Sequence, residues 1–433
     1  MVRVQNLQFQ QLKHTLQYAY KNSAFYQRLY DKVGLPPDKI KNFDDFAKLP
    51  VVTKDDLRKY NWEIPAVSQD KWIDISVTSG TTGTPIYLPW TKKDFQRLAK
   101  ITSILHRTAG ICRSDVVHLT YPLGAGMWIA GLHNWLGLYK NGVCSLRFGP
   151  GFTEAQLHTM QKLKPTVLLG SPSFLLKLGS QAKEKALLET IKPRLICVSG
   201  ENIVEHDFSY NALGRNLVEI WGGAKVKPVY GVSEGPICGT VCENGKGYHI
   251  PSEFFYLEIL DIRTHQGVSP GSRGLLAMTV LGAEAFPLIR YVLGDISFIR
   301  ESQCNCGGQF VYLGPILGRS DRLIKFKGLL ISPEEIAHFI AGIHQIKSYY
   351  LELYKDEYFL DQLRVYVSVR QGDSSPDHEK LKLSIEKVIR AHFRINVEII
   401  TKPDDEIVRK ITLDKHSKPR RKPIYFFDLR HSG

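Results

Sequence analysis

The sequence predicts an α/β protein with a large N-terminal domain of mixed and parallel sheets and helices, a β-rich subdomain, and a small C-terminal α+β domain. Short apolar strands alternate with helices between residues 116 and 200, which is typical of a parallel sheet covered by helices. From about residue 248 the pattern changes to successive β-strands. About 110 residues follow Asp321, enough for a separate small domain. We therefore expect domains at 1–320, with the subdomain at 248–317, and at 321–433.

The N-terminal part is predicted to begin with helices. Apolar and aromatic residues recur at helical spacing between residues 5 and 35, and Pro36 and Pro37 end this stretch. Residues 43–57 are predicted to form two short helices, with Thr53 as the N-cap of the second. Alternating apolar residues from Trp72 to Val77 then predict a strand.

The predicted parallel sheet has its strands at 116–119, 143–148, 166–170 and 194–200. Helices are predicted at 92–110, from the Gly-rich turn after the first strand to residue 135, at 153–163 and at 174–188. Ligands of such sheets bind at the carboxyl ends of the strands, so we expect site residues there. Strands of the subdomain are predicted at 254–260, 275–280, 288–292 and 296–300. In the C-terminal domain we expect a strand at 322–331, a helix at 333–343, strands near 347–354 and 363–369, a helix at 377–393 and a strand at 396–400.

Composition restricts the class of protein. The chain has 433 residues, of which 43% are hydrophobic, and no apolar run approaches the ~20 residues that span a bilayer. The N-terminus lacks the apolar core of a signal peptide, so we expect a cytoplasmic protein without a membrane partner. The net charge of +14 is explained at least as well by a polyanionic small-molecule ligand as by nucleic acid, because no nucleic-acid-binding module is evident.

A hydroxyl-rich loop is predicted after the strand that ends at Val77. Two glycines and several hydroxyl residues stand together in the run Thr78-Ser79-Gly80-Thr81-Thr82-Gly83-Thr84-Pro85. Glycines allow main-chain N–H groups to turn toward an anion, and hydroxyls add donors. The run differs from a P-loop because no Gly-Lys-Ser/Thr follows. A phosphate-binding loop and a plain surface turn both fit this pattern.

Four potential metal ligands stand in two pairs. Cys242 precedes His249 by seven residues, and Cys304 and Cys306 flank Asn305. One imidazole and three thiols suit a closed, tetrahedral zinc site, although the spacing is not that of a zinc finger. Unrelated buried cysteines are the alternative. The remaining cysteines, Cys112, Cys144, Cys197 and Cys238, lie on or beside apolar runs and are expected in the core.

Several separated motifs, in this order, resemble the adenylate-forming superfamily, and most of all its phenylacetate–coenzyme A ligase-like branch, which includes relatives associated with capsular polysaccharide biosynthesis. The resemblance covers essentially the whole chain, from the stretch 49–58 to the C-terminus. It implies two steps. A carboxylate attacks the α-phosphorus of ATP and pyrophosphate leaves; a thiol or another nucleophile then displaces AMP from the acyl-adenylate.

The resemblance assigns nucleotide-binding roles along the chain. It places the β- and γ-phosphates on the loop Ser79, Gly80, Thr81, Thr82 and Gly83, although the lysine that the family often has near the end of this loop is missing. Tyr230, followed by Gly231, matches the residue that stacks on adenine. Ser233 lies near the α-phosphate, and Glu234 matches the Mg²⁺ ligand. Asp295 matches the carboxylate that accepts both ribose hydroxyls, and Arg319 a nucleotide contact. Arg290 is either structural or a phosphate contact.

The C-terminal domain is mobile in this superfamily, and Asp321 matches its hinge. Lys422 aligns with the catalytic lysine of adenylation, with Lys418 as the rival. A zinc ion held by Cys242, His249, Cys304 and Cys306 is also implied, as a structural ion that stabilises the β-rich subdomain. The cofactors implied are thus ATP, Mg²⁺, coenzyme A and structural Zn²⁺.

The acid pocket is implied around the strand ends. Its predicted residues are Tyr121, Gly126, His133, Ser199, Gly200 and Glu201. Aromatic side chains suit an aryl acid by offset stacking. His133 either meets the substrate or packs in the core, which is the more common role of a lone histidine on an apolar helix.

Three functions are considered. The first is a ligase that joins a small carboxylic acid, which the resemblance leads us to expect to be aromatic, to coenzyme A. The second is an adenylating enzyme that passes the acyl group to a carrier protein or an amine. The third is a non-catalytic or nucleic-acid-binding relative, against which the complete set of motifs argues. The oligomeric state is expected to be monomer or homodimer.

Overall fold

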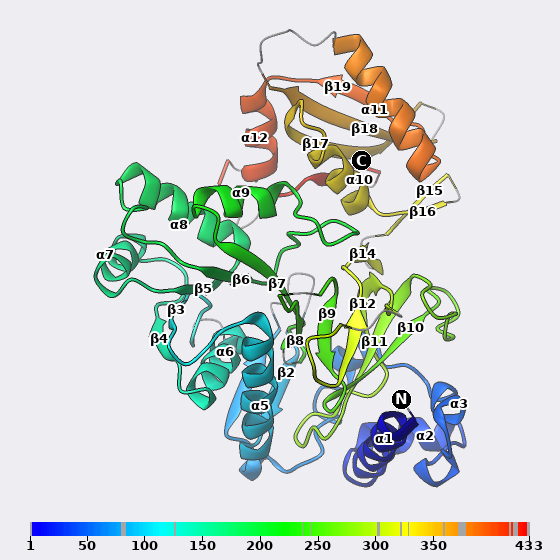
Figure 1. Cartoon of the computed structure of the whole chain (residues 1–433). Helices are drawn as coiled ribbons and strands as arrows, with labels where there is room; N and C mark the ends of the chain where they lie inside the picture. The colour runs from blue at the N-terminus through cyan, green and yellow to red at the C-terminus, as the bar shows by residue number, and fades with distance from the viewer. Residues whose placement is uncertain are drawn as a thin grey trace. The chain divides into compact units, whose positions relative to one another are not determined.

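The computed structural model describes residues 2–78, 84–124, 127–235, 237–243, 245–300, 304–320, 323–327, 329–357, 360–370, 378–414, 417–418 and 423–430. The chain divides into two compact units, residues 1–316 and 317–433. Both units combine helices and sheets, so the predicted α/β class is confirmed (Figure 1).

An eight-stranded sheet forms the centre of the first unit. Its strands follow the order β13-β9-β8-β7-β6-β5-β3-β4. The strands on the β4 side are parallel, namely β4 (Cys144–Arg147), β3 (Val116–Leu119), β5 (Val167–Gly170), β6 (Leu195–Val198) and β7 (Lys225–Gly231). The others are antiparallel, namely β8 (Ile237–Thr240), β9 (Tyr248–Pro251) and β13 (Phe310–Leu313).

Helices cover both faces of the parallel part, and the strand sequences show why. Val167 and Leu169 of β5 belong to one core with residues of α5 (Lys92–Ala109) and α6 (Ile129–Lys140). Leu168, between them, belongs to the core on the opposite face, which includes residues of α7 (Thr153–Leu163), α8 (Pro172–Glu184) and α9 (Ala212–Ile220). A strand that is buried on both faces must be apolar at every position, as β5 is.

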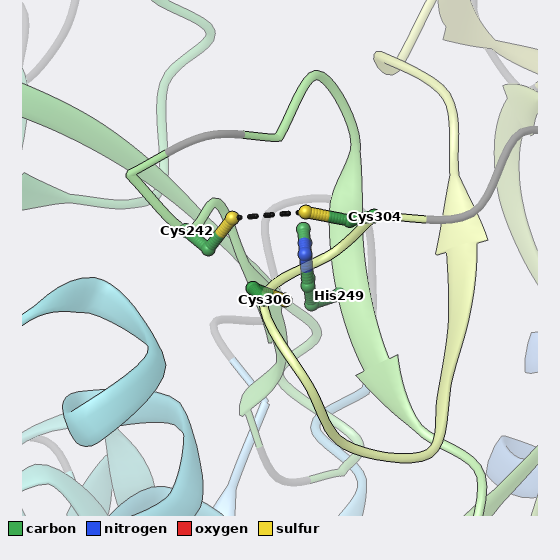
Figure 2. A group of neighbouring side chains, drawn as sticks. All are labelled: Cys242, His249, Cys304 and Cys306. Carbon is green, nitrogen blue, oxygen red and sulfur yellow. Dashed lines mark hydrogen bonds between the residues drawn. The ribbon is translucent and has the colours of Figure 1, made fainter.

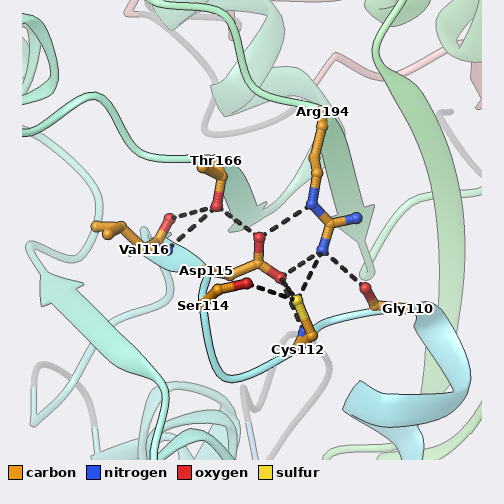
Figure 3. A network of polar contacts seen from close by, with 7 residues as sticks. All are labelled: Gly110, Cys112, Ser114, Asp115, Val116, Thr166 and Arg194. Atoms are coloured by element: carbon orange, nitrogen blue, oxygen red, sulfur yellow. Dashed lines mark hydrogen bonds and ion pairs between the residues drawn. The ribbon is translucent and has the colours of Figure 1, made fainter.

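A polar network ties the amino ends of three parallel strands together (Figure 3). Asp115 precedes β3, Thr166 precedes β5 and Arg194 precedes β6. Arg194 donates from Nε to Asp115 Oδ1 over 2.9 Å and from Nη2 to the Gly110 carbonyl over 2.8 Å, and Thr166 donates to Asp115 over 2.7 Å. Burial raises the pKa of Asp115, but the hydrogen bonds from Arg194, the Cys112 backbone and Thr166 outweigh it and hold the pKa at about 2.

The cysteines outside the predicted metal site differ in burial. Cys197 and Cys238 are buried as expected, but Cys112 and Cys144 are exposed, so for these two the prediction was wrong. Cys144 begins β4, the edge strand of the sheet, which has no further strand to cover it.

The β-rich region contains the antiparallel strands β10 (Phe255–Leu260), β11 (Gly274–Val280) and β12 (Tyr291–Ser297). Two strands predicted at 288–292 and 296–300 are in fact the single strand β12. Arg290 has a φ of +48°, which breaks the extended chain just before β12, so this strand begins at Tyr291 and not at 288. Its guanidinium is buried, pairs with Glu258 at 3.0 Å and donates to the carbonyls of Ala47 and Leu49, so Arg290 is structural.

The N-terminal helices share a core with the β-rich region. They are α1 (Val2–Asn22), α2 (Ala24–Lys32), α3 (Phe43–Ala47) and α4 (Lys54–Lys59), followed by the hairpin β1 (Asp74–Val77) and β2 (Tyr87–Trp90). The Tyr26 hydroxyl donates to the Pro287 carbonyl and accepts from the Ile289 N–H, both over 3.1 Å. Thr53 caps α4 through a capping box with Asp56, as predicted.

The second unit is built on the sheet β19-β18-β17-β20. Its strands are β17 (Ile346–Lys355), β18 (Asp361–Val369), β19 (Glu398–Thr401) and β20 (Phe426–Asp428); its helices are α10 (Pro333–Ala341), α11 (His378–Phe393) and α12 (Asp404–Thr412). The strand predicted at 322–331 is instead a hairpin of β15 (Ile324–Phe326) and β16 (Leu329–Ile331), with Lys327 at a φ of +46°. Within the described ranges, no helix of either unit is long and apolar enough to cross a membrane.

Candidate active site

Two predicted pocket residues, Tyr121 and Ser199, meet at the carboxyl ends of the parallel strands. Tyr121 follows β3 and Ser199 follows β6. The Tyr121 hydroxyl donates to the carbonyl of Gly170, the last residue of β5, over 2.7 Å; it lies 2.7 Å from Ser199 Oγ and accepts from the Ser199 N–H. Burial raises the pKa of Tyr121, so its hydroxyl stays protonated at neutral pH. Next to Ser199, Gly200 has a φ of +92°, and Glu201 receives a hydrogen bond from Ser173.

Two predicted nucleotide-binding residues are joined directly. The Tyr230 hydroxyl, near the end of β7, donates a 2.6 Å hydrogen bond to Asp295 Oδ2 in β12. Both side chains are buried. A carboxylate held by a protein hydrogen bond is oriented before any ligand arrives, and a carboxylate can accept several hydrogen bonds. This arrangement suits recognition of paired hydroxyl groups.

Glu234 carries a partner that the sequence did not indicate. Lys54, the first residue of α4, places its ammonium 2.8 Å from Glu234 Oε1, and Glu234 is only 7% exposed. A cavity beside Glu234 is also lined by Arg97 of α5, whose pKa burial lowers to about 10. A buried carboxylate that is paired with a cation can bind a metal ion, or its cation can turn to a phosphate oxygen. Ser233 and Gly231, in contrast, are exposed.

A second cavity lies beside Tyr121 and Ser199, which line it together with Thr102, His106 and Asn134. His133, for which a substrate contact and a packing role were both considered, is not among the described residues that line this cavity. It is buried, and burial lowers its pKa to about 3, so its imidazole is neutral. His106 was not identified from the sequence, because both histidines lie on apolar helices and spacing alone does not say which one faces a cavity.

The four predicted zinc ligands converge although they come from distant parts of the chain (Figure 2). Their ligand atoms all lie within 4.8 Å of one another, and the sulfurs of Cys242 and Cys304 are 3.4 Å apart. His249 Nδ1 lies 3.0 Å from the Gly247 carbonyl, which makes Nδ1 the protonated nitrogen and leaves Nε2 for a metal. A Cβ on Gly245 would lie 2.9 Å from the Cys242 sulfur, so glycine is needed there. The donor set fits Zn²⁺.

Comparison with known proteins places the chain in a family. The model of the AMP-binding enzyme family matches residues 18–280, more than half of the chain. The chain belongs to the AMP-binding enzyme family. It is 29% identical over 381 residues to the phenylacetate-coenzyme A ligase of Thermus thermophilus, covering 85% of this chain and 82% of that protein. It is also 28% identical to the enzyme of the same name from Pseudomonas putida, covering 90% and 88%. The predicted phenylacetate–coenzyme A ligase-like branch is thereby confirmed.

Solved structures agree on the fold of this AMP-binding enzyme. A 2-hydroxyisobutyryl-CoA ligase in its postadenylation state superposes with a TM-score of 0.81, at 20% identity, over 98% of this chain and 89% of that one. The same ligase in an open conformation gives a TM-score of 0.75.

Several residues that matter to an AMP-binding enzyme lie outside the described part of the chain. They are Ser79, Gly80, Thr81, Thr82 and Gly83 of the predicted phosphate loop, Gly126, Asp321 and Lys422. Arg319 is described, in β14 (Gly318–Arg319) of the second unit. The roles assigned to these residues stay predictions.

Proposed function

We propose that the protein activates a small carboxylic acid with ATP and transfers the acyl group to coenzyme A. In the first step a carboxylate oxygen bonds to the α-phosphorus and pyrophosphate leaves. In the second, the thiol of coenzyme A loses its proton, bonds to the acyl carbon and releases AMP. The observation that carries the proposal is the Tyr230–Asp295 hydrogen bond at 2.6 Å, a prepared acceptor for the ribose in a chain similar to phenylacetate-coenzyme A ligases along most of its length.

We propose roles for the residues around this pair. The Tyr230 ring stacks on adenine and Asp295 accepts the ribose hydroxyls, with Ser233 near the α-phosphate. Glu234 holds Mg²⁺, which would neutralise phosphate charge when bound. Lys54, already 2.8 Å from Glu234, contacts a phosphate oxygen and supplies the positive charge that the loop ending at Thr84 lacks. Asp321 acts as the hinge of the C-terminal domain. Lys422 supplies a positive charge that stabilises the transition state of adenylation.

We also propose that Cys242, His249, Cys304 and Cys306 hold a structural zinc ion. The close ligand atoms, the free Nε2 of His249 and the glycine at 245 support this. A closed four-ligand site leaves no position for substrate, so the ion stabilises the loop before β13 and takes no part in the reaction. The cytoplasmic location and the choice between monomer and homodimer stay predictions.

The decisive experiment is pyrophosphate release from ATP and Mg²⁺ with a panel of aryl, arylacetic, fatty and amino acids, each with and without coenzyme A. Release that requires an acid, with formation of the acyl-CoA thioester, is the expected result. Acid-dependent release that leaves coenzyme A unchanged would point to a carrier protein or an amine as acceptor. No release with any acid would contradict the proposal.

A further inference from the structure

The cavity beside Tyr121 and Ser199 is lined by residues of two helices as well as by residues of the sheet. Thr102 and His106 line it from α5, and Asn134 lines it from α6. The remaining wall is apolar except for Thr240 and includes Leu169 of β5. About 10 Å³ is open to the centre of a water-sized sphere, which is room for about one water-sized group.

Two buried polar atoms in this wall have no partner. Thr102 Oγ1 and His106 Nδ1 make no hydrogen bond with any residue that the structure describes. Thr102 is 0% exposed and His106 is 5% exposed. Buried polar groups in folded proteins are almost always hydrogen-bonded, so two such atoms on one cavity indicate a missing ligand or water.

The hydrogen-bonding role of His106 Nδ1 follows from its neighbours. Asn134 Nδ2 donates to the Ala130 carbonyl over 2.9 Å, so Asn134 Oδ1 faces the imidazole. His106 Nε2 lies 3.0 Å from that oxygen and must carry the proton. Burial lowers the pKa of His106 to about 4, so the ring is neutral. Nδ1 is therefore an acceptor, and only a group with an O–H or N–H can satisfy it.

We propose that the acid substrate carries a hydroxyl or amino group that enters this cavity, donates a hydrogen bond to His106 Nδ1 and contacts Thr102 Oγ1. The proposal rests on the proposed function and names its substrate class. A methyl or methoxy group cannot donate to Nδ1, and a second carboxylate would place an anion against an acceptor. A group of one heavy atom also matches the size of the space. Thr102 and His106 thus determine specificity rather than take part in bond making.

The test compares matched acids: phenylacetate and benzoate, each with its hydroxy, amino and methoxy derivatives. We measure kcat/KM from pyrophosphate release, and separately the shift in Tm caused by each acid without ATP. The best hydroxy-substituted or amino-substituted acid is expected to exceed its unsubstituted parent about 100-fold or more in kcat/KM. A site built to hydrogen-bond a substrate group strongly rejects analogues that lack this group. An unsubstituted or methoxy acid that performs as well would overturn the proposal.

Variants assign the preference to the two residues. Thr102→Val and His106→Phe should each reduce the preference about 10-fold or more, measured as the ratio of kcat/KM for the donor-bearing acid to kcat/KM for its parent acid. His106→Asn, which keeps an acceptor near the position of Nδ1, should restore part of the preference. Thr108→Val is the matched control, because this residue of α5 satisfies its hydroxyl with the Ile104 carbonyl and should change nothing.

The two proposals fail in different ways. If no acid releases pyrophosphate, the proposed function is wrong; a Tm shift specific to donor-bearing acids and lost in His106→Phe would still support the cavity's role. If acids react but Thr102→Val and His106→Phe affect donor-bearing and parent acids alike, the cavity holds only a trapped water, and the inference about the substrate is overturned.

Discussion

The hydroxyl of Tyr230 donates a 2.6 Å hydrogen bond to the carboxylate of Asp295, 65 residues further along the chain. The Tyr230→Phe variant keeps the ring and removes this donor. We expect KM for ATP to rise about 10–150-fold with a smaller change in kcat, since a hydrogen bond to a charged group contributes roughly 1.5–3 kcal/mol. Steady-state kinetics with varied ATP tests this.

The matched control for that variant is Tyr210→Phe, because the Tyr210 hydroxyl also bonds an oxygen, the Val226 carbonyl at 2.6 Å. It should lower stability without changing KM for ATP. Equal KM effects in the two variants would contradict a specific role for Tyr230.

The ion pair between Lys54 and Glu234 leads to a second prediction. Lys54→Met should reduce kcat/KM for ATP about 10-fold or more, because it leaves the buried Glu234 carboxylate unpaired. The Lys54 side chain is 40% exposed, so the loss is smaller than for a fully buried pair. Lys48→Met is the control: its pair with Asp45 is exposed and contributes little.

In Glu234→Gln, adenylation should slow and its dependence on Mg²⁺ should weaken; an unchanged rate would remove Glu234 from the site.

Zinc content is the third prediction. Purified protein should contain one zinc ion per chain, and Cys306→Ser should lose it and unfold at lower temperature, because metal binding contributes directly to folding. Cys112→Ser, at an exposed cysteine outside the cluster, should keep the ion. Elemental analysis and a thermal scan decide the matter; metal-free protein with unaltered stability in Cys306→Ser would disprove the site.

Acid should weaken the fold through Asp115. Its folded-state pKa of about 2 lies below the ordinary value of 3.8, so its contribution to stability is complete above pH 4 and is lost as pH falls toward 2. Asp115→Asn should destabilise the first unit by about 1–3 kcal/mol at pH 7, because Arg194 and Thr166 lose a charged acceptor. Urea unfolding at pH 7 and pH 3 should show that the difference in the free energy of unfolding between wild type and variant is smaller at pH 3. A constant gap would contradict the ionised role of Asp115.

The lysines near the C-terminus provide the fifth prediction. Lys422→Ala should slow adenylation about 100-fold or more, by removing a cation from the transition state, and should spare thioester formation from a supplied acyl-adenylate. Lys418→Ala is the comparison. If Lys418→Ala shows this pattern instead, the catalytic lysine is Lys418.

Much of the fold could be predicted because buried segments have a recognisable apolar pattern in the local sequence. Strand β5 reads as an uninterrupted apolar run, since Val167 and Leu168 face different helical layers. The short strand β20 (Phe426–Asp428) has no such pattern. Its three residues become a strand only by pairing with β17, which is far away in sequence. Likewise, the break at Arg290 depends on its burial against Glu258 and was invisible locally.

Residues of the candidate site could be singled out from the sequence where they belong to short motifs. Tyr230, Glu234 and Asp295 were singled out in this way, and so were the four cysteine and histidine side chains that the structure brings together; their roles stay predictions. Lys54 was noticed only as part of a helix start, because its contact with Glu234 depends on how α4 packs. His106 was missed because the direction in which a helical side chain points is decided by tertiary packing and not by spacing alone.

The hydrogen bonds of Tyr26 to residues 287 and 289 also constrain how the protein is made. The first helices cannot complete their core until 263 further residues have been synthesised. At about 5–20 residues per second, this is a wait of roughly 13–50 s. During that time α1 and α2 lack their packing partners in the β-rich region, so apolar surface that is buried in the folded protein stays exposed, and slow translation through the β-rich region would lengthen this exposure.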